Sequence, residues 1–242
     1  MGSFLNVCIF RLPQNLSIVS PRSFCPHCQK PITAYDNIPL WSYLFLRGKC
    51  RNCQERISWR YPLVEALTGA IALSLYAKFC LTPVFVALLA FAAAMIVITF
   101  IDLDHRIIPD VISLPGIGIG FFLSFFLSNV SVKDSLIGII AGGGILFGVA
   151  WGYEALTKRE GMGGGDVKLL AMIGAWLGWK AILFTLFFAS LSGTFIGGGA
   201  MLLQKQGRHY AIPFGPFLAF SALAYVFFGP QLIDWYLNWG RP

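Results

Sequence analysis

The stretch that decides the fold class is LTPVFVALLAFAAAMIVITFI, residues 81–101, which holds no charged side chain. A helix needs about 20 such residues to cross a bilayer. Further apolar runs lie on both sides of it, and we expect helices near 62–79, 82–101, 111–129, 136–156, 167–179, 181–203 and 211–229. The sequence therefore predicts an all-α polytopic membrane protein with about seven spans.

The composition supports this class and excludes others. Hydrophobic residues make up 57% of the 242 residues and charged residues 12%, against about 25% charged in soluble domains. So few charges could not cover a soluble surface, and so much hydrophobicity excludes disorder. Six cysteines in a chain of this length are too few for a disulfide-stapled module.

The net charge is concentrated at one end. Residues 1–60 hold eight basic and two acidic side chains, so they carry +6 of the net +7. Lys and Arg favour the cytoplasmic side of membrane proteins and meet anionic lipid there. We therefore expect this segment inside the cell, in contact with membrane lipid. We expect no nucleic-acid partner, because no motif that reads DNA or RNA is present.

The first residues, MGSFLNVCIF, are apolar but too few to span a membrane. They are either an interfacial segment or the end of a longer first membrane helix, and we favour the second. The expected organisation is then a helix stub at 1–13, a cytoplasmic module at 14–60 and a membrane domain at 61–242.

Four cysteines in the cytoplasmic module form two C-x2-C pairs, Cys25 with Cys28 and Cys50 with Cys53. Each pair can point two thiolates at one ion, and two pairs complete a tetrahedral shell. Two disulfides or four free thiols are the alternatives, and the reducing cytoplasm disfavours the disulfides. We expect a structural zinc in a small ribbon-like module, with no open coordination position for catalysis.

Aspartates stand at the ends of two expected membrane helices. Asp102 and Asp104 follow the 81–101 run, and Asp166 follows Gly163–Gly165 at the start of another. Alternating the spans places both groups at the cytoplasmic face. Carboxylates at membrane depth are costly and mark functional sites. A third aspartate, Asp110, follows Pro109 and is expected to start the next helix.

Two carboxylates in contact can hydrolyse a peptide without a metal. One stays ionised and takes a proton from water, while its protonated partner hydrogen-bonds the scissile carbonyl. Asp102 and Asp104 are two apart and face nearly opposite ways on a helix, so only one can meet Asp166. Spacing alone does not choose between them. Proton relay or cation binding is the competing interpretation of such aspartates.

Taken together and in order, these motifs resemble those of the bacterial type IV prepilin peptidases, which are membrane aspartic proteases of the GxGD type. The resemblance covers nearly the whole chain. The matching segments are Gly2–Val7, the two C-x2-C pairs, Arg60–Glu65, Asp102–Asp104 with Ile108–Asp110, and Gly163–Asp166.

The resemblance implies that Asp102 and Asp166 are the catalytic pair of a peptidase domain at 61–242. It implies cleavage of prepilins and pseudopilins at the cytoplasmic face of the bacterial inner membrane. N-methylation with S-adenosylmethionine is implied to follow, with Gly48 at a position associated with methyl transfer. Because prepilin leaders are expected to be basic, the acids near that face, Glu65, Asp104 and Glu160, are candidate substrate-binding residues.

Two other interpretations compete with this one. A membrane transporter or sensor bearing a zinc ribbon would share the spans and the cysteines. Its aspartates would have no need to lie within hydrogen-bonding reach of each other. A peptidase that lacks the methyltransferase activity would not need the four-cysteine module.

Overall fold

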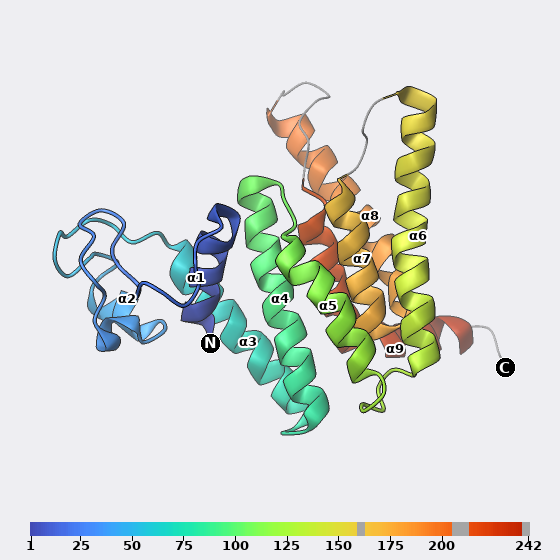
Figure 1. Ribbon diagram of the computed structural model, residues 1–242, viewed down its shortest axis with the longest axis horizontal. Coiled ribbons are helices and arrows are strands. Elements are labelled where there is room, and N and C mark those ends of the chain that lie inside the picture. The colour runs from blue at the N-terminus through green and yellow to red at the C-terminus, as the bar shows by residue number, and fades with distance from the viewer. Residues whose placement is uncertain (159–162, 205–212, 239–242) are drawn as a thin grey trace. The chain divides into compact units, whose positions relative to one another are not determined.

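The computed structural model describes residues 1–158, 163–204 and 213–238 (Figure 1). The chain forms two compact units, Met1–Val97 and Ile98–Pro242, and the boundary falls inside one helix. The units are described separately below.

The first unit combines short helices and loops with one long helix and part of a second. Its elements are α1 (Gly2–Arg11), η1 (Leu12–Gln14), η2 (Ala34–Asn37), α2 (Trp41–Phe45), α3 (Arg60–Phe79) and the first part of α4 (Pro83–His105). Helix α1 runs antiparallel to the start of α3. Gly2 packs against Glu65, and the side-chain amide of Asn6 donates to the Tyr61 carbonyl over 3.1 Å.

Arg11 fixes the chain that leaves α1. Its side chain is 5% exposed, and its guanidinium donates to the carbonyls of Ser17 and Pro21, each over 2.8 Å. A buried charge requires such partners. The loop that leads toward the first cysteine pair is therefore ordered by a side chain of the N-terminal helix.

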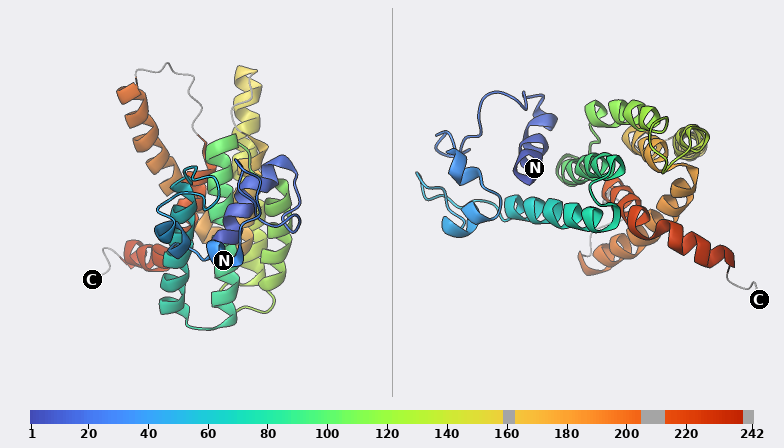
Figure 2. Two further views of the ribbon diagram at one scale, coloured as in Figure 1. Left: turned by 90° about the vertical axis from the view of Figure 1, so that its left-hand side faces the viewer. Right: turned by 90° about the horizontal axis from the view of Figure 1, so that it is seen from below.

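The second unit is a helical bundle built around one short helix. It contains the end of α4, followed by α5 (Asp110–Leu123), α6 (Val132–Thr157), α7 (Gly164–Leu177), α8 (Trp179–Gln204) and α9 (Gly215–Asn238). Helices α5, α6, α8 and α9 all pack on α7 (Figure 1 and Figure 2). Every residue from Leu169 to Leu177 is buried, so α7 is the core of this unit.

Small residues and polar side chains bring the neighbours of α7 close to it. Gly138 of α6 and Gly174 of α7 touch backbone to backbone, which a side chain at either position would prevent. Ser135 donates from Oγ to the Ala175 carbonyl over 2.8 Å, and Trp176 donates from Nε1 to the Gly116 carbonyl over 2.8 Å. Such contacts hold helices together in lipid, where apolar burial between helices contributes little.

The expected all-α membrane architecture is confirmed, and each of the seven expected helices is present. Five are long and apolar enough to cross a membrane, namely α3, α4, α6, α8 and α9. Helices α5 and α7 have only 14 residues each, or roughly 21 Å at 1.5 Å per residue, less than the ~30 Å hydrocarbon core. The shortness of α7 is explained by its burial, because it is surrounded by protein.

Four of the expected boundaries were wrong, and one of them is the start of α6, which lies at Val132 instead of residue 136. Helix α4 continues to His105 and so carries both aspartates that were expected to follow it. Helix α5 ends at Leu123, because the chain turns at Ser124 instead of continuing to residue 129. Helix α9 begins at Gly215 and passes through Pro230 to Asn238, whereas the expected start at residue 211 lies outside the described residues.

Candidate active site and metal centre

Asp102 lies on the last turn of α4 and is 5% exposed. Its Oδ2 accepts a hydrogen bond from the backbone N–H of Gly215 over 3.0 Å. Asp104, two residues later, is exposed. Helix α4 thus distinguishes Asp102 from Asp104, which spacing alone could not do, because it buries Asp102 and exposes Asp104.

At the start of α9, the backbone N–H of Gly215 is available to bond Asp102. The amides of Phe217 and Leu218 bond to the Phe214 carbonyl, and Pro216 has no N–H. The Gly215 N–H points instead at the carboxylate, at the positive end of the helix dipole. A Cβ at residue 215 would lie 2.6 Å from Asp102 Oδ2, so the close approach requires glycine.

Asp166 occupies the first turn of α7, directly after the glycine run. Its N–H bonds to the Gly163 carbonyl over 3.2 Å, and the residue is half-buried. The two aspartates come from helices that are 64 positions apart in sequence, and the fold brings them to one place.

Ile108 explains how the segments meet. This residue lies in the loop after α4, and its side chain packs against the glycines that start the other two helices. A Cβ at Gly165 would lie 2.9 Å from Ile108 Cβ, and one at Gly215 would lie 3.3 Å from Ile108 Cδ1. The end of α4 and the starts of α7 and α9 therefore surround one apolar side chain, with the aspartates beside it.

A salt bridge adjoins this site. Lys168 of α7 reaches Asp110 with Nζ at 2.7 Å from Oδ1 and 2.8 Å from Oδ2. Asp110 begins α5, as expected, with Pro109 as its N-cap residue. The pair ties the start of α5 to the helix that carries Asp166.

Sequence reasoning missed Gly215 and Lys168. A signal for the first was present, because Pro213-Phe214-Gly215-Pro216 has the glycine and proline of a helix start next to an apolar run. Lys168 follows Asp166 by two residues inside an expected membrane helix, where a charge is itself a sign of a site or a partner.

The four expected metal ligands are also brought together. The Sγ atoms of Cys25, Cys28, Cys50 and Cys53 all lie within 4.8 Å of one another, and none of these cysteines is in a disulfide. Cys25 Sγ and Cys53 Sγ are 3.8 Å apart. Tetrahedral Zn–S bonds of ~2.3 Å require sulfur atoms ~3.8 Å apart, so the cluster is close to the size that a zinc ion requires.

The two cysteine pairs sit in matching turns. The Cys25 N–H donates to the Lys30 carbonyl over 3.0 Å, and the Cys50 N–H donates to the Glu55 carbonyl over 2.8 Å. In each turn a glutamine follows the second cysteine with positive φ, 55° at Gln29 and 59° at Gln54. The same backbone path therefore delivers two sulfur atoms from each side.

The second turn favours a thiolate at one of its two cysteines. The backbone N–H groups of Cys53 and Asn52 lower the pKa of Cys50 to about 6, whereas burial and hydrogen bonds to the other thiols raise the pKa of Cys53 to about 11. Metal ligation requires the deprotonated thiol. The donor set, its size and its backbone therefore fit a four-thiolate metal site.

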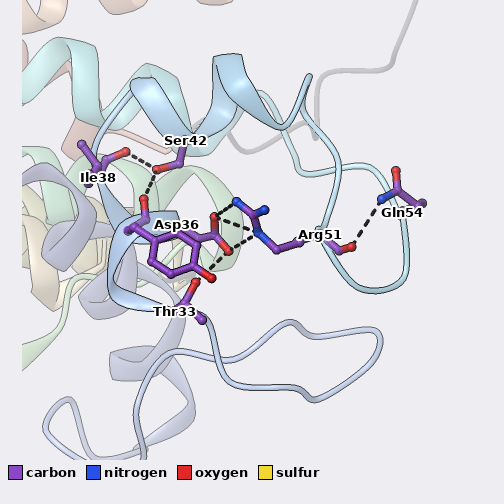
Figure 3. A network of polar contacts seen from close by, with 7 residues as sticks. Thr33, Asp36, Ile38, Ser42, Arg51 and Gln54 are labelled. Carbon is purple, nitrogen blue, oxygen red and sulfur yellow. Dashed lines mark hydrogen bonds and ion pairs between the residues drawn. The ribbon is translucent and has the colours of Figure 1, made fainter.

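A polar network holds the module around this cluster (Figure 3). Arg51 Nη2 lies 2.7 Å from Asp36 Oδ1, and Thr33 Oγ1 donates to Asp36 Oδ2 over 2.8 Å. The hydrogen bond from Arg51 holds the pKa of Asp36 below its usual range. This network links the segment after the first cysteine pair to the second pair.

The remaining candidate residues are Gly48, Glu65 and Glu160. Gly48 has φ of 68°, and a Cβ there would lie 3.1 Å from the Tyr43 ring. Glu65 accepts the Leu40 N–H on Oε2 over 2.9 Å. Both belong to the first unit. Glu160 lies outside the described residues.

Comparison with known proteins decides the family. The model of the bacterial peptidase A24 N-terminal domain matches residues 1–79, and that of the type IV leader peptidase family matches residues 89–198. The chain belongs to the type IV leader peptidase family. The identification made from the motifs is thereby confirmed, and a transporter or sensor is not favoured.

Curated relatives of this leader peptidase extend over nearly its full length. It is 42% identical to the prepilin leader peptidase/N-methyltransferase of Aeromonas hydrophila, over 98% of this chain and 90% of the relative. It is 36% identical to the proteins of the same name from Stutzerimonas stutzeri, over 100% and 91%, and Pseudomonas aeruginosa, over 98% and 90%. No solved structure gives a significant match.

Proposed function

We propose that this leader peptidase cleaves prepilins and pseudopilins with Asp102 and Asp166, and then methylates the new N-terminus. Membership of the family makes the chain a peptidase, and its relatives carry both activities in their names. The observation that carries the residue assignment is that α4, α7 and α9 meet at Ile108. Its side chain lies against Gly165, the residue before Asp166, and against Gly215, whose N–H bonds Asp102.

The proposed reaction needs one proton shared by the two carboxyls. We assign the ionised state to Asp102, because its Oδ2 accepts the Gly215 N–H at the positive end of α9. Asp166 then holds the proton. Two carboxyls that share a site do not both ionise readily, so in this mechanism the apparent pKa values belong to the pair.

The hydrolysis then proceeds in two steps, addition of water and breaking of the C–N bond. The oxygen of water attacks the scissile carbonyl carbon, Asp102 takes a water proton, and the carbonyl oxygen takes the proton of Asp166. Breaking the C–N bond gives the leaving nitrogen the proton from Asp102 and returns a hydroxyl proton to Asp166. The products are a carboxylic acid and a free amine, and the starting protonation of the pair is restored.

The amine released by cleavage is the acceptor of the proposed methyl transfer. S-adenosylmethionine, when bound, supplies an electrophilic methyl group. Gly48 is the residue of this chain that we assign to this activity. Its positive φ and its fit against Tyr43 suit a backbone position where a side chain would be excluded.

We propose that the four cysteines hold zinc and that the ion is structural. Four thiolates fill a tetrahedral shell and leave no position for water. The ion would fix the two turns against each other and so order the module. We retain the proposed boundaries of an N-terminal helical segment at 1–13, the tetracysteine module at 14–60 and the peptidase domain at 61–242.

The chain is a multi-pass membrane protein, and the part of it that the structure describes contains five helices long enough to span a bilayer. We propose the bacterial inner membrane as its location, with the basic residues of 1–60 and the aspartates on the cytoplasmic side. A prepilin with an apolar N-terminal helix would then arrive laterally through lipid, with its cleavage site at the level of the aspartates.

One experiment tests both activities. The purified protein, in lipid nanodiscs with zinc retained, is incubated with a prepilin and S-adenosylmethionine, and the N-terminus of the product is analysed by mass spectrometry. We expect removal of the leader and addition of one methyl group. An intact leader would contradict the peptidase assignment, and a cleaved but unmethylated product would contradict the second activity alone.

A further inference from the structure

The short helix α2 presents an apolar face that no part of its own unit covers among the described residues. Trp41, Leu44 and Phe45 are 64%, 69% and 79% exposed. Their spacing places them on one side of the helix. The rings of Trp41 and Phe45 stack with centroids 6.0 Å apart, so the face is preformed.

The opposite side of α2 is tied into the module. Ser42 Oγ donates to the Ile38 carbonyl over 2.6 Å (Figure 3), and the Tyr43 ring packs against Gly48. These contacts prevent the helix from rotating to bury its apolar side. The outward direction of Trp41, Leu44 and Phe45 is therefore a property of the fold.

Helix α2 is hydrogen-bonded to the first turns of α3, which is long and apolar enough to span a membrane. Leu40, its N-cap residue, donates its N–H to Glu65 of α3 over 2.9 Å. Glu65 lies five residues beyond Arg60, where α3 begins, which is ~7.5 Å along the helix at 1.5 Å per residue. The polar layer on each side of the hydrocarbon core is of similar thickness, since a bilayer is about 40–45 Å thick and its core ~30 Å.

We propose that α2 is inserted in the membrane interface, with Trp41, Leu44 and Phe45 in lipid where the headgroups meet the acyl chains. Aromatic side chains favour this depth. Arg47 and Lys49 follow the helix directly and are exposed, so they can reach the phosphates of anionic lipid. The partner is thus an anionic lipid surface, and α2 anchors the four-cysteine module to it.

This inference rests on α3 crossing the bilayer and not on the catalytic role of the aspartates. Basic charge alone would hold the module above the headgroups, in water. The hydrogen bond between Leu40 and Glu65 holds α2 beside the first turns of α3. The exposed aromatic face provides the reason for insertion. A water-exposed α2 and an α2 covered by protein are the outcomes that the test must separate.

Fluorine NMR of fluorotryptophan-labelled protein in nanodiscs that contain phosphatidylglycerol provides the test. The Trp41 signal is assigned by its loss in Trp41→Phe. Nitroxide lipids, with the spin label near the headgroup end of the acyl chain, report contact with the interface. A gadolinium chelate in the buffer reports contact with water.

A matched probe comes from Val19→Trp. Val19 is 86% exposed and follows the end of α1 that points away from Glu65, so we expect it in water. We expect Trp41 to lose most of its signal to the nitroxide lipids and to keep it with the chelate, and residue 19 to show the reverse. Replacing phosphatidylglycerol by phosphatidylcholine should weaken the nitroxide effect at Trp41.

A Trp41 signal quenched by the chelate and spared by the lipids would overturn the proposal. A signal that neither reagent affects would overturn it as well, because the face would then be covered by protein. Prepilin cleavage is measured in the same nanodiscs. Normal cleavage with a water-exposed Trp41 would contradict the insertion of α2 and leave the peptidase assignment intact.

Discussion

The backbone N–H of Gly215 donates to Oδ2 of Asp102 across 3.0 Å, although the two residues are 113 positions apart in sequence. The start of the last helix thereby fixes the rotamer of the buried aspartate and places a positive helix end beside its charge. Glycine is required there, because a side chain would occupy the space of the carboxylate. The last helix therefore belongs to the candidate active site.

Gly215→Ala should lower the turnover number of prepilin cleavage by about 10²-fold, since displacing a reacting group by an ångström costs about that much. The added methyl would lie 2.6 Å from Asp102 Oδ2. The pH dependence of cleavage should shift as well, because the added methyl group displaces the residue 215 N–H that donates to Asp102.

The matched control is Gly148→Ala, at a helical glycine with nothing within 4 Å of the added atom. We expect it to keep wild-type turnover and pH dependence. Equal losses in both variants would show that the effect of Gly215→Ala is general, and thermal unfolding of each variant would separate loss of fold from loss of positioning.

The salt bridge between Lys168 and Asp110 should contribute little to stability. Its side chains are 38% and 54% exposed, and pairs of this kind are worth about 0–1 kcal/mol. Lys168→Met and Asp110→Asn should therefore leave the melting temperature nearly unchanged. We expect cleavage to fall by less than about tenfold in either variant, because the pair positions α7 without touching the substrate.

The exchanged double variant, Lys168→Asp with Asp110→Lys, should recover part of the cleavage lost in the single exchange Lys168→Asp. Equal turnover in the single and double exchanges would contradict a positioning role for the pair.

The membrane class, the helices and the cysteine cluster could be predicted because their signals are local. Apolar runs such as 81–101 specify spans by length, and C-x2-C pairs specify a turn with two sulfur atoms. The end of α4 was harder, because charged residues end an apolar run without ending the helix. Asp102 and Asp104 are thus helical although they follow the apolar segment.

Contacts between distant segments could not be predicted from spacing. The choice of Asp102 over Asp104 depends on the rotation of α4 against α9, and no local pattern encodes it. The need for glycine at residue 215 could not be predicted from spacing either, because it arises from the carboxylate of Asp102 on another helix. The resemblance to a family supplied the proposed catalytic pair, whereas the hydrogen bond that orients Asp102 had to come from the three-dimensional structure.

Metal content provides another prediction. Protein purified without chelator should hold one zinc per chain. Cys25→Ser combined with Cys28→Ser should remove it, because only two thiolates of the four-coordinate shell would then remain. Cys80→Ser is the control, since Cys80 lies outside the cluster.

Elemental analysis measures the occupancy, and hydrogen exchange of residues 22–58 measures the order of the module. Metal-free protein with a protected module would contradict a structural ion.

The acids proposed to bind the basic leader can be separated by their surroundings. Asp104 is exposed, whereas Glu65 holds the Leu40 N–H. Asp104→Asn should raise KM for prepilin by a few-fold, since an exposed charge contributes about 1 kcal/mol or less, and should leave turnover unchanged.

Glu65→Gln keeps an oxygen for Leu40 but removes the charge, so a similar rise in KM would support its substrate role. Glu65→Leu removes the hydrogen bond as well and should loosen α2, as measured by hydrogen exchange. An unchanged KM in both neutral variants, Asp104→Asn and Glu65→Gln, would contradict leader binding by these acids.

The most direct test of the central claim is the cleavage rate of purified Asp166→Asn in nanodiscs, compared with Asp102→Asn and with Asp104→Asn as control. Mass spectrometry of the prepilin N-terminus gives the rate. General acid–base catalysis contributes about 10²–10⁴-fold, so each dyad variant should lose at least that much while its thermal unfolding stays close to wild type, and Asp104→Asn should retain most of its turnover. Near-normal cleavage by Asp166→Asn would contradict the aspartate dyad.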